Sequence, residues 1–198
     1  MLREAVAAGM PGAMIGTQPF GDHGNLDDPQ LDPFWTCAAQ LKVPIIVHPM
    51  FGSGDARLTD FEMMNAVGRV SDVTIAIARL LFSGHLIKHE DLRLVASTGG
   101  GALPYALGRL QRNHHAHPNA VADPVEGFSR LYFDSIVFTS DTLRFLLDKV
   151  GAGRIMLGSD YPFPIGDPQP RRVIEEGGFS VEECEQMLGG VATQLFCL

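Results

Sequence analysis

The chain has 198 residues, of which 45% are hydrophobic and 19% are charged, a composition that permits a domain with a hydrophobic core. Its net charge is −8 and it contains no run of four basic residues, which argues against a nucleic-acid partner because phosphates require clustered Lys and Arg. The three cysteines form no Cys-x-x-Cys pair, no apolar run approaches membrane-spanning length, and the first residues do not resemble a signal peptide. We therefore expect a cytoplasmic protein with reduced thiols and no membrane partner.

Short apolar runs alternate with longer amphipathic stretches along the whole chain. The sequence predicts strands at residues 13–17, 43–47, 92–96, 131–133 and 155–157. It predicts helices at residues 2–8, 31–41, 59–82 with a break near 68–71, 102–112, 139–150, 180–188 and 191–196. This alternation indicates βαβ units and a parallel sheet, so the expected fold class is α/β. No stretch resembles an interdomain linker, and we expect a single domain over residues 1–198.

A carboxylate follows the last predicted strand. Residues 155–157 are apolar, a Gly-Ser pair comes next, and Asp160 precedes Tyr161-Pro162. A continuous apolar run is typical of a buried parallel strand. A carboxylate at the end of such a strand is costly to desolvate unless a metal ion, a substrate or a protonated base is its partner. Asp160 is therefore a candidate site residue, with a turn or a helix cap as the alternative role.

The strand predicted at residues 43–47 has the same design, because it ends in His48 and Pro49. Imidazole is the commonest metal ligand and suits zinc. Active sites of parallel barrels lie at the C-terminal ends of the strands, so His48 and Asp160 together indicate a metal site in a barrel. For His48 taken alone, a hydrogen-bonded loop residue is the alternative.

Other polar residues give weaker signals. Asp134 follows the strand at 131–133 and would either orient a group in the site or cap the next helix. The run Gly99-Gly100-Gly101 would either receive a substrate carboxylate on its N–H groups or permit close strand-to-helix packing. His115 and His117 form a His-x-His string, which we assign to a solvated loop rather than to a metal. Asp167 is assigned to a turn.

The remaining histidines and cysteines give no sign of chemistry. His23, His85 and His89 fall in turns or connections, and we expect them at the surface. Cys37 falls on a predicted helix and Cys197 near the chain end, so neither indicates a nucleophile.

Three strings in the chain resemble a known family. They are Val47-His48-Pro49, the run from Gly99 to Arg109, and Leu157-Gly158-Ser159-Asp160-Tyr161-Pro162-Phe163-Pro164. They are similar to the amidohydrolase superfamily, and within it to the branch of aminocarboxymuconate-semialdehyde decarboxylase. Residues 28–35 and 187–190 also resemble that branch. The similarity covers nearly the whole chain in the expected order.

The resemblance implies a TIM-type (β/α)₈ barrel that holds one divalent metal, usually zinc. In this sequence His48 matches the metal ligand at the end of strand five, and Asp160 matches the ligand at the end of strand eight. Arg109 matches an arginine that crosses a dimer interface to bind the substrate carboxylate. The implied partners are therefore a small carboxylate substrate and a second copy of the chain.

The sequence also departs from the family pattern. The His-x-His pair of the first strand is absent, so the chain is expected to begin just before strand four and to form a partial barrel of about strands four to eight. A typical barrel needs about 250 residues. Thr98 occupies the position of the acid/base histidine at the end of strand six, and Thr cannot replace imidazole in that role at neutral pH.

Three functions follow from the resemblance and its departures. The first is a metal-dependent carboxy-lyase, a decarboxylase that acts on a small unsaturated or aromatic carboxylate, with Asp160 as catalytic residue and metal ligand. The second is a metal-dependent hydrolase of an amide, ester or lactone. The third is an inactive barrel fragment or interaction module, whose open strand edges near residues 13–17 and 155–157 would be covered by the terminal helices or by oligomerisation.

Overall fold

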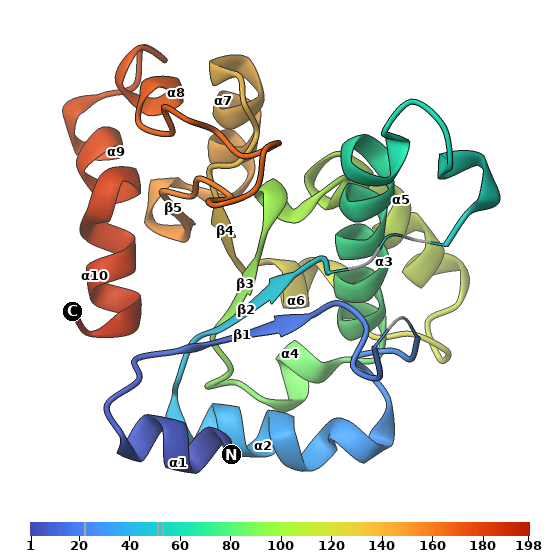
Figure 1. The fold of residues 1–198 in the computed structure, drawn as a ribbon. Helices are drawn as coiled ribbons and strands as arrows, with labels where there is room; N and C mark the ends of the chain where they lie inside the picture. The colour runs from blue at the N-terminus through green and yellow to red at the C-terminus, as the bar shows by residue number, and fades with distance from the viewer. Residues whose placement is uncertain (22, 51, 53) are drawn as a thin grey trace.

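The chain forms a five-stranded parallel sheet with helices between its strands (Figure 1). The structure is a computed structural model that describes residues 1–21, 23–50, 52 and 54–198. The strands follow one another in the order β1-β2-β3-β4-β5, with bounds Ala13–Gly16, Ile45–His48, Leu94–Ala96, Tyr132–Asp134 and Ile155–Met156. Consecutive parallel order with helical crossovers is the arrangement of a TIM-type barrel. The predicted α/β class and parallel sheet are therefore confirmed.

Helices occupy the connections between strands. Their bounds are α1 Leu2–Ala7, α2 Asp32–Leu41, α3 Arg69–Phe82, α4 His85–Lys88, α5 Leu103–Ala116, α6 Pro124–Phe128, α7 Ser140–Val150, α8 Arg172–Glu175, α9 Val181–Glu185 and α10 Val191–Phe196. A π-helical turn over Met64–Gly68 leads directly into α3, close to the break predicted in that long helix. Helix α9, which falls within the helix predicted at residues 180–188, begins with a capping box formed by Ser180 and Glu183.

Four helices differ from the sequence prediction. The short helices α4, α6 and α8 were not predicted, because each spans only about one turn beside Pro or Gly residues. Helix α5 continues past residue 112 to Ala116, since polar residues extend its solvent-exposed side. In the segment 51–54, which contains Gly52 and Gly54 and for which the sequence suggests a loop, Phe51 and Ser53 lie outside the described residues.

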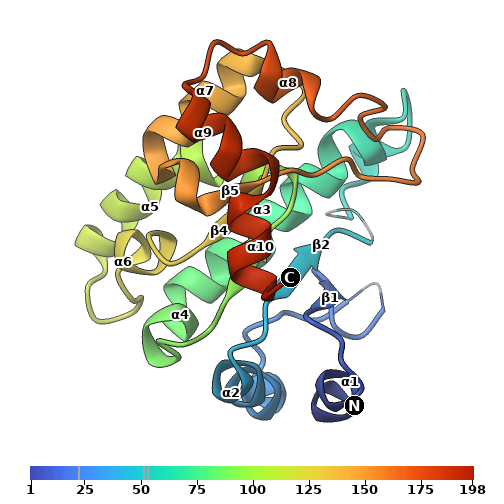
Figure 2. The same ribbon diagram turned by 90° about the vertical axis from the view of Figure 1, so that its left-hand side faces the viewer.

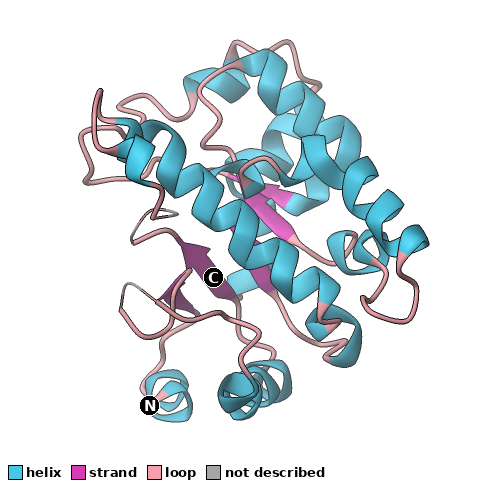
Figure 3. Ribbon diagram, turned by 90° about the vertical axis from the view of Figure 1, so that its right-hand side faces the viewer, coloured by secondary structure: helices cyan, strands magenta, loops and turns pink. Residues whose placement is uncertain are grey.

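One face of the sheet forms the main hydrophobic core. Alternate strand residues point to this outer face, and the register aligns Val47, Ala96, Phe133 and Ile155 across four strands. All four are fully buried against apolar residues of α2, α3 and α7. Figure 3 shows helices covering the strands on this side. Trp35 of α2 is fully buried there, and its indole N–H donates to the Leu26 carbonyl at 2.8 Å.

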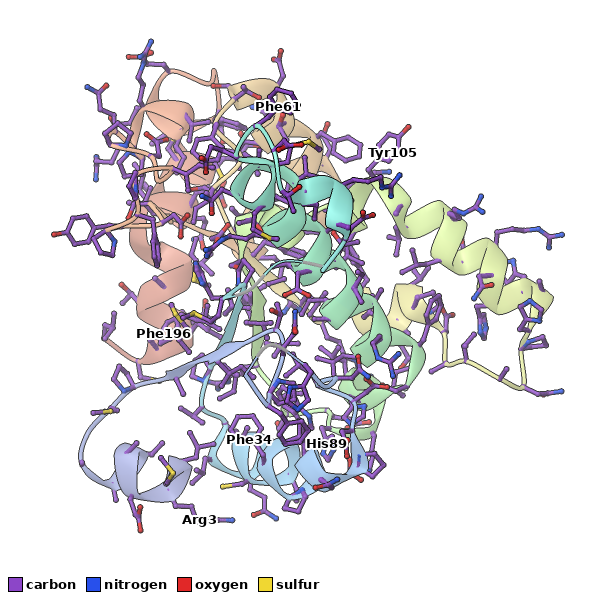
Figure 4. The ribbon with its side chains drawn as sticks, turned by 45° about the vertical axis from the view of Figure 1, so that its right-hand side comes forward. Arg3, Phe34, Phe61, His89, Tyr105 and Phe196 are labelled. Carbon is purple, nitrogen blue, oxygen red and sulfur yellow. The ribbon has the colours of Figure 1, made fainter. Side chains whose placement is uncertain are left out.

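The opposite, inner face is apolar near the start of the strands. Ile46, Val95 and Tyr132 align in register on this face. They form a second hydrophobic cluster with Met156 and with Val191 and Leu195 of α10, which are buried in it. Figure 2 shows α10 lying in front of the sheet, and Figure 4 labels its Phe196. The C-terminal helix therefore covers the lower part of the inner face, by which we mean the part near the N-terminal ends of the strands.

The two outer strands have different surroundings. β5 contacts α10 and the π-helical turn over Gln186–Gly190, as predicted for an edge covered by a terminal helix. On β1, the side chain of Met14 is 60% exposed. No helix among the described residues is long and apolar enough to cross a membrane.

Candidate functional site

A cavity of about 690 Å³ lies at the C-terminal ends of the strands. His48 at the end of β2 and Asp160 after β5 both line it, together with Thr98 from the loop after β3. The lower part of the inner face is filled by α10, so the cavity occupies the upper part of that face. This is the end of a parallel sheet at which barrel enzymes place their active sites.

His48 and Asp160 meet in this cavity. The His48 Nε2 lies 2.9 Å from Asp160 Oδ1, although 112 positions separate the two residues in the chain. Both side chains are largely buried, at 11% and 13% exposure. The second ring nitrogen, His48 Nδ1, is buried without a hydrogen-bond partner among the described residues. The structure therefore brings together the two residues that the sequence singled out, one at the end of the second strand and one after the last strand.

The loop after β5 fixes the position of Asp160. The Ser159 carbonyl accepts from the Asp167 N–H at 2.8 Å, which closes the loop. Phe163 lies parallel to the His48 imidazole, with ring centroids 6.0 Å apart. Asp167 Oδ1 accepts from the Gln169 N–H at 2.8 Å, as expected for the turn predicted there.

Backbone strain concentrates around the cavity. Seven described residues other than glycine have positive φ angles, and five of them line the cavity. These five are Phe61, Glu62, Thr98, Phe138 and Asp160. Figure 4 shows Phe61 on the loop that precedes α3. Strained conformations persist where surrounding structure enforces them, and they cluster at functional sites.

Asp134 organises the loop beside the cavity. It ends β4, and its carboxylate accepts three backbone N–H groups, from Thr98 at 2.9 Å, Gly99 at 2.8 Å and Ile136 at 3.2 Å. Burial raises the pKa of Asp134 to about 6, while the three N–H donors and the nearby His48 act in the opposite direction. Asp134 holds the turn after β3, which includes the cavity residue Thr98, and this agrees with the prediction that it orients a group in the site.

The glycine run does not present free N–H groups to a ligand. The Gly99 N–H donates to Asp134, the Gly100 N–H to the Ser97 carbonyl and the Gly101 N–H to the Thr98 carbonyl. A Cβ added to Gly100 would lie 2.7 Å from the Phe133 ring. The prediction of an anion site on this run is therefore wrong, and the close-packing alternative is confirmed.

Arg69 is a cavity residue that sequence reasoning missed. It is the first residue of α3, and its Nη1 donates to the Pro49 carbonyl at 3.3 Å. Its Nε is buried without a partner among the described residues. The available signal was the break predicted near residues 68–71, where the π-helical turn places Arg69 beside the strand ends.

Arg109 lies away from the cavity of its own chain. It is exposed on α5 and does not line the cavity. Tyr105, one helical turn earlier, is 86% exposed and projects outward (Figure 4). The prediction that Arg109 acts across an interface remains a prediction.

The other histidines lie outside the cavity. His115 is on α5 rather than in a loop, because that helix extends to Ala116, and both His115 and His117 are exposed. The surface position predicted for His85 is wrong, since His85 is buried with its ring edge-on to Trp35 at 6.3 Å. Burial lowers the pKa of His85, and the nearby Asp32 acts in the opposite direction.

The donors in the cavity fit part of a metal site. A largely buried imidazole and carboxylate that converge from two strands are suitable ligands for a divalent metal. No group of three or more His, Cys, Asp or Glu side chains suited to a metal occurs among the described residues. A catalytic zinc normally has three protein ligands, so His48 and Asp160 would hold such an ion only with a further donor.

Fold and site together define a barrel-type α/β protein with a cavity at the C-terminal ends of its strands. The chain belongs to the amidohydrolase family, which matches residues 1–198. It is 32% identical over 196 residues to 2-amino-3-carboxymuconate-6-semialdehyde decarboxylase of Dictyostelium discoideum, covering 96% of this chain and 54% of the relative. The homologous Caenorhabditis elegans enzyme is 34% identical over 156 residues, covering 75% and 39%. The predicted family and branch are confirmed.

Solved structures share the fold. The apo form of Metarhizium anisopliae IDCase matches with a TM-score of 0.79 and 26% identity, over 98% of this chain and 59% of that chain. A dihydroxybenzoic acid decarboxylase from Polaromonas, solved with manganese and the inhibitor 2-nitroresorcinol, matches with a TM-score of 0.85 and 22% identity, over 100% and 64%. The chain spans about half the length of the Dictyostelium relative, in agreement with the predicted partial barrel.

Proposed function

We propose that this chain supplies the His48 and Asp160 part of a metal-dependent decarboxylase site for a small unsaturated or aromatic carboxylate. The observation that carries the proposal is the 2.9 Å approach of His48 Nε2 and Asp160 Oδ1 within the cavity. The proposal is also supported by similarity, because relatives of the chain are a 2-amino-3-carboxymuconate-6-semialdehyde decarboxylase and a γ-resorcylate decarboxylase.

His48 and Asp160 would hold a divalent metal, which supplies Lewis acidity when bound. Zinc suits the imidazole ligand, and manganese is the metal in the Polaromonas structure. Decarboxylation breaks the carbon–carboxylate bond, releases CO₂ and leaves an electron pair on carbon that must receive a proton. We assign Asp160 to take a proton from a water molecule and pass it to that carbon, which leaves hydroxide, because Thr98 stands where the family's acid/base histidine is expected.

The walls of the cavity suit a flat substrate. Phe138, Phe163 and Ile165 line it together with Ile136 and Val137. Apolar walls exclude water and strengthen the electrostatic interactions of the enclosed charges. We further propose a homodimer in which the exposed Arg109 contacts the neighbouring chain's substrate; the oligomeric state from light scattering tests that proposal.

The test of the proposed function is CO₂ release by the purified chain supplied with zinc or manganese and a panel of aromatic and unsaturated carboxylates. We expect CO₂ release that is lost in His48→Ala and Asp160→Ala and retained in the exposed-residue control His117→Ala. Formation of a product acid from amides, esters or lactones, without CO₂, would instead indicate the hydrolase alternative.

A second candidate function has its own support. Thr98 in place of a histidine, and two converging donors where three are usual, favour a folded barrel piece that binds metal or another protein without turnover. Metal binding at His48 and Asp160 with no CO₂ and no hydrolysis product would select this function over the decarboxylase.

A further inference from the structure

We propose that Arg69 is the residue of this chain's own cavity that binds a carboxylate, so that the ligand is a planar carboxylate. The choice of substrate class rests on the proposed function, whereas the binding role of Arg69 is tested without any turnover. Arg69 belongs to none of the strings that carry the family resemblance, and its place in the cavity is a property of this structure.

Arg69 has unused hydrogen-bonding capacity. Its one hydrogen bond within the described residues is the 3.3 Å contact from Nη1 to the Pro49 carbonyl, the residue next to His48. Nε is buried and has no partner there. Leaving a buried donor unsatisfied destabilises the folded chain. An incoming acceptor would remove that destabilisation, so the side chain is prepared for an anion.

Most other arginines on the molecule have a carboxylate partner. Arg57, Arg79, Arg130, Arg144, Arg171 and Arg172 each form an ion pair with an Asp or Glu. Arg69 forms none within the described residues, although Glu62 and Asp160 line the same cavity. Its charge is therefore available to a ligand.

The cavity offers a ligand no second permanent cation from this chain. Of the described residues that line it, Arg69 is the sole Lys or Arg. The backbone N–H groups of Gly99, Gly100 and Gly101 are already used by acceptors in the protein. A carboxylate entering the cavity of a single chain therefore has Arg69 as its direct charged partner.

The walls determine the shape of that ligand. The imidazole of His48 and the ring of Phe163 lie nearly parallel, at 16° to each other, and further apolar side chains come from the segment 136–138. Flat apolar walls favour an aromatic ring or a conjugated chain. A guanidinium binds a carboxylate through two parallel hydrogen bonds, so Arg69 would also fix the orientation of such a ring.

Binding of benzoate and of neutral benzamide to the full chain tests the proposal. Calorimetric or NMR titration should show that Arg69→Gln weakens benzoate binding about 10- to 100-fold and leaves benzamide binding unchanged. Arg69→Lys keeps the charge but loses the paired hydrogen bonds, and we expect it to fall between wild type and Arg69→Gln. Arg112→Gln, an equal change of charge at an exposed position on α5, is the matched control and should bind benzoate like wild type.

Three results would overturn the proposal. They are benzoate affinity that is equal in wild type and Arg69→Gln, an equal loss of benzoate and benzamide, and wild type that binds benzoate no better than benzamide. If Arg69→Gln fails to fold, as judged by its thermal transition, the comparison of Arg69→Lys with wild type decides. Intact, Arg69-dependent benzoate binding without CO₂ release would reject the decarboxylase proposal and leave this one standing.

Discussion

The two faces of the sheet differ in the side chains that they bury. On the outer face, residues such as Val47 and Phe133 are fully buried among apolar side chains of the helices. On the upper part of the inner face, the same strands end in His48 and Asp134, and buried polar atoms such as His48 Nδ1 lack partners among the described residues. One face therefore provides stability, and the other accepts polar and strained residues that favour ligand binding.

The largest effect on stability is expected from the outer face. Phe133→Ala removes a fully buried ring between α6 and the sheet, where it packs against Phe128 with ring centroids 5.3 Å apart. We expect a loss of about 3–5 kcal/mol in the free energy of unfolding, measured by urea denaturation. The exposed aromatic control Tyr105→Ala should change it by less than about 0.5 kcal/mol. Equal effects of the two variants would contradict the comparison of the faces.

A gain of activity is expected at the cavity. Thr98→His places an imidazole where the resemblance expects an acid/base, and histidine tolerates a positive φ angle better than threonine. General acid–base catalysis is worth about 10²-fold or more, so we expect the rate of CO₂ release from a substrate to rise by about that factor. Thr142→His, which changes another threonine lining the same cavity, should have no such effect. An unchanged rate in Thr98→His would show that this position is not where the proton is supplied.

A moderate loss of stability is expected from the polar residue that organises the inner face. Asp134→Asn replaces a carboxylate that accepts three backbone N–H groups with an amide that has one acceptor oxygen. We expect a loss of about 1–3 kcal/mol in the free energy of unfolding. Asp148→Asn at an exposed position of α7 is the matched control. If Asp134→Asn were as stable as the control, the hydrogen bonds of Asp134 to Thr98 and Gly99 would not stabilise the turn after β3.

The smallest expected effect is a pH dependence of the free energy of unfolding, which arises from His85, buried against Trp35 among the helices. Burial lowers the pKa of His85 in the folded protein, so below the unfolded value of about 6.5 the unfolded chain binds more protons. The contribution of His85 is therefore present above pH 6.5 and is lost as the pH falls through its lowered pKa. Urea denaturation between pH 8 and pH 5 should show a smaller decline in His85→Gln than in wild type. His117→Gln, at an exposed position, should decline as wild type does.

The sequence was sufficient to predict features that depend on local patterns. The apolar runs predicted as strands at 43–47 and 92–96 correspond to the strands β2 and β3, because parallel strands are covered on both faces and therefore have continuous apolar sequences. His48 and Asp160 were identified because each follows such a run, and their approach in space follows from the strand order. The capping box at Ser180 depends on residues three positions apart, which the sequence displays directly.

Features that depend on tertiary contacts could not be predicted from local sequence patterns. The use of the Gly99 N–H by Asp134 joins two loops 35 positions apart, so the glycine run alone suggested an open anion site. The burial of His85 depends on its contact with Trp35, from a different helix. Arg69 was missed because a single arginine in a helix is usually solvated, and only the π-helical turn before it brings it to the cavity.

The central claim is that His48 and Asp160 hold a divalent metal at the upper part of the inner face. Equilibrium dialysis of the full chain against zinc or manganese, followed by elemental analysis, tests it most directly. We expect one metal bound per chain in wild type and in His117→Ala, more weakly than at a site with three protein ligands, and its loss in both His48→Ala and Asp160→Ala. Metal retained by both of those variants, or absent from wild type, would contradict it.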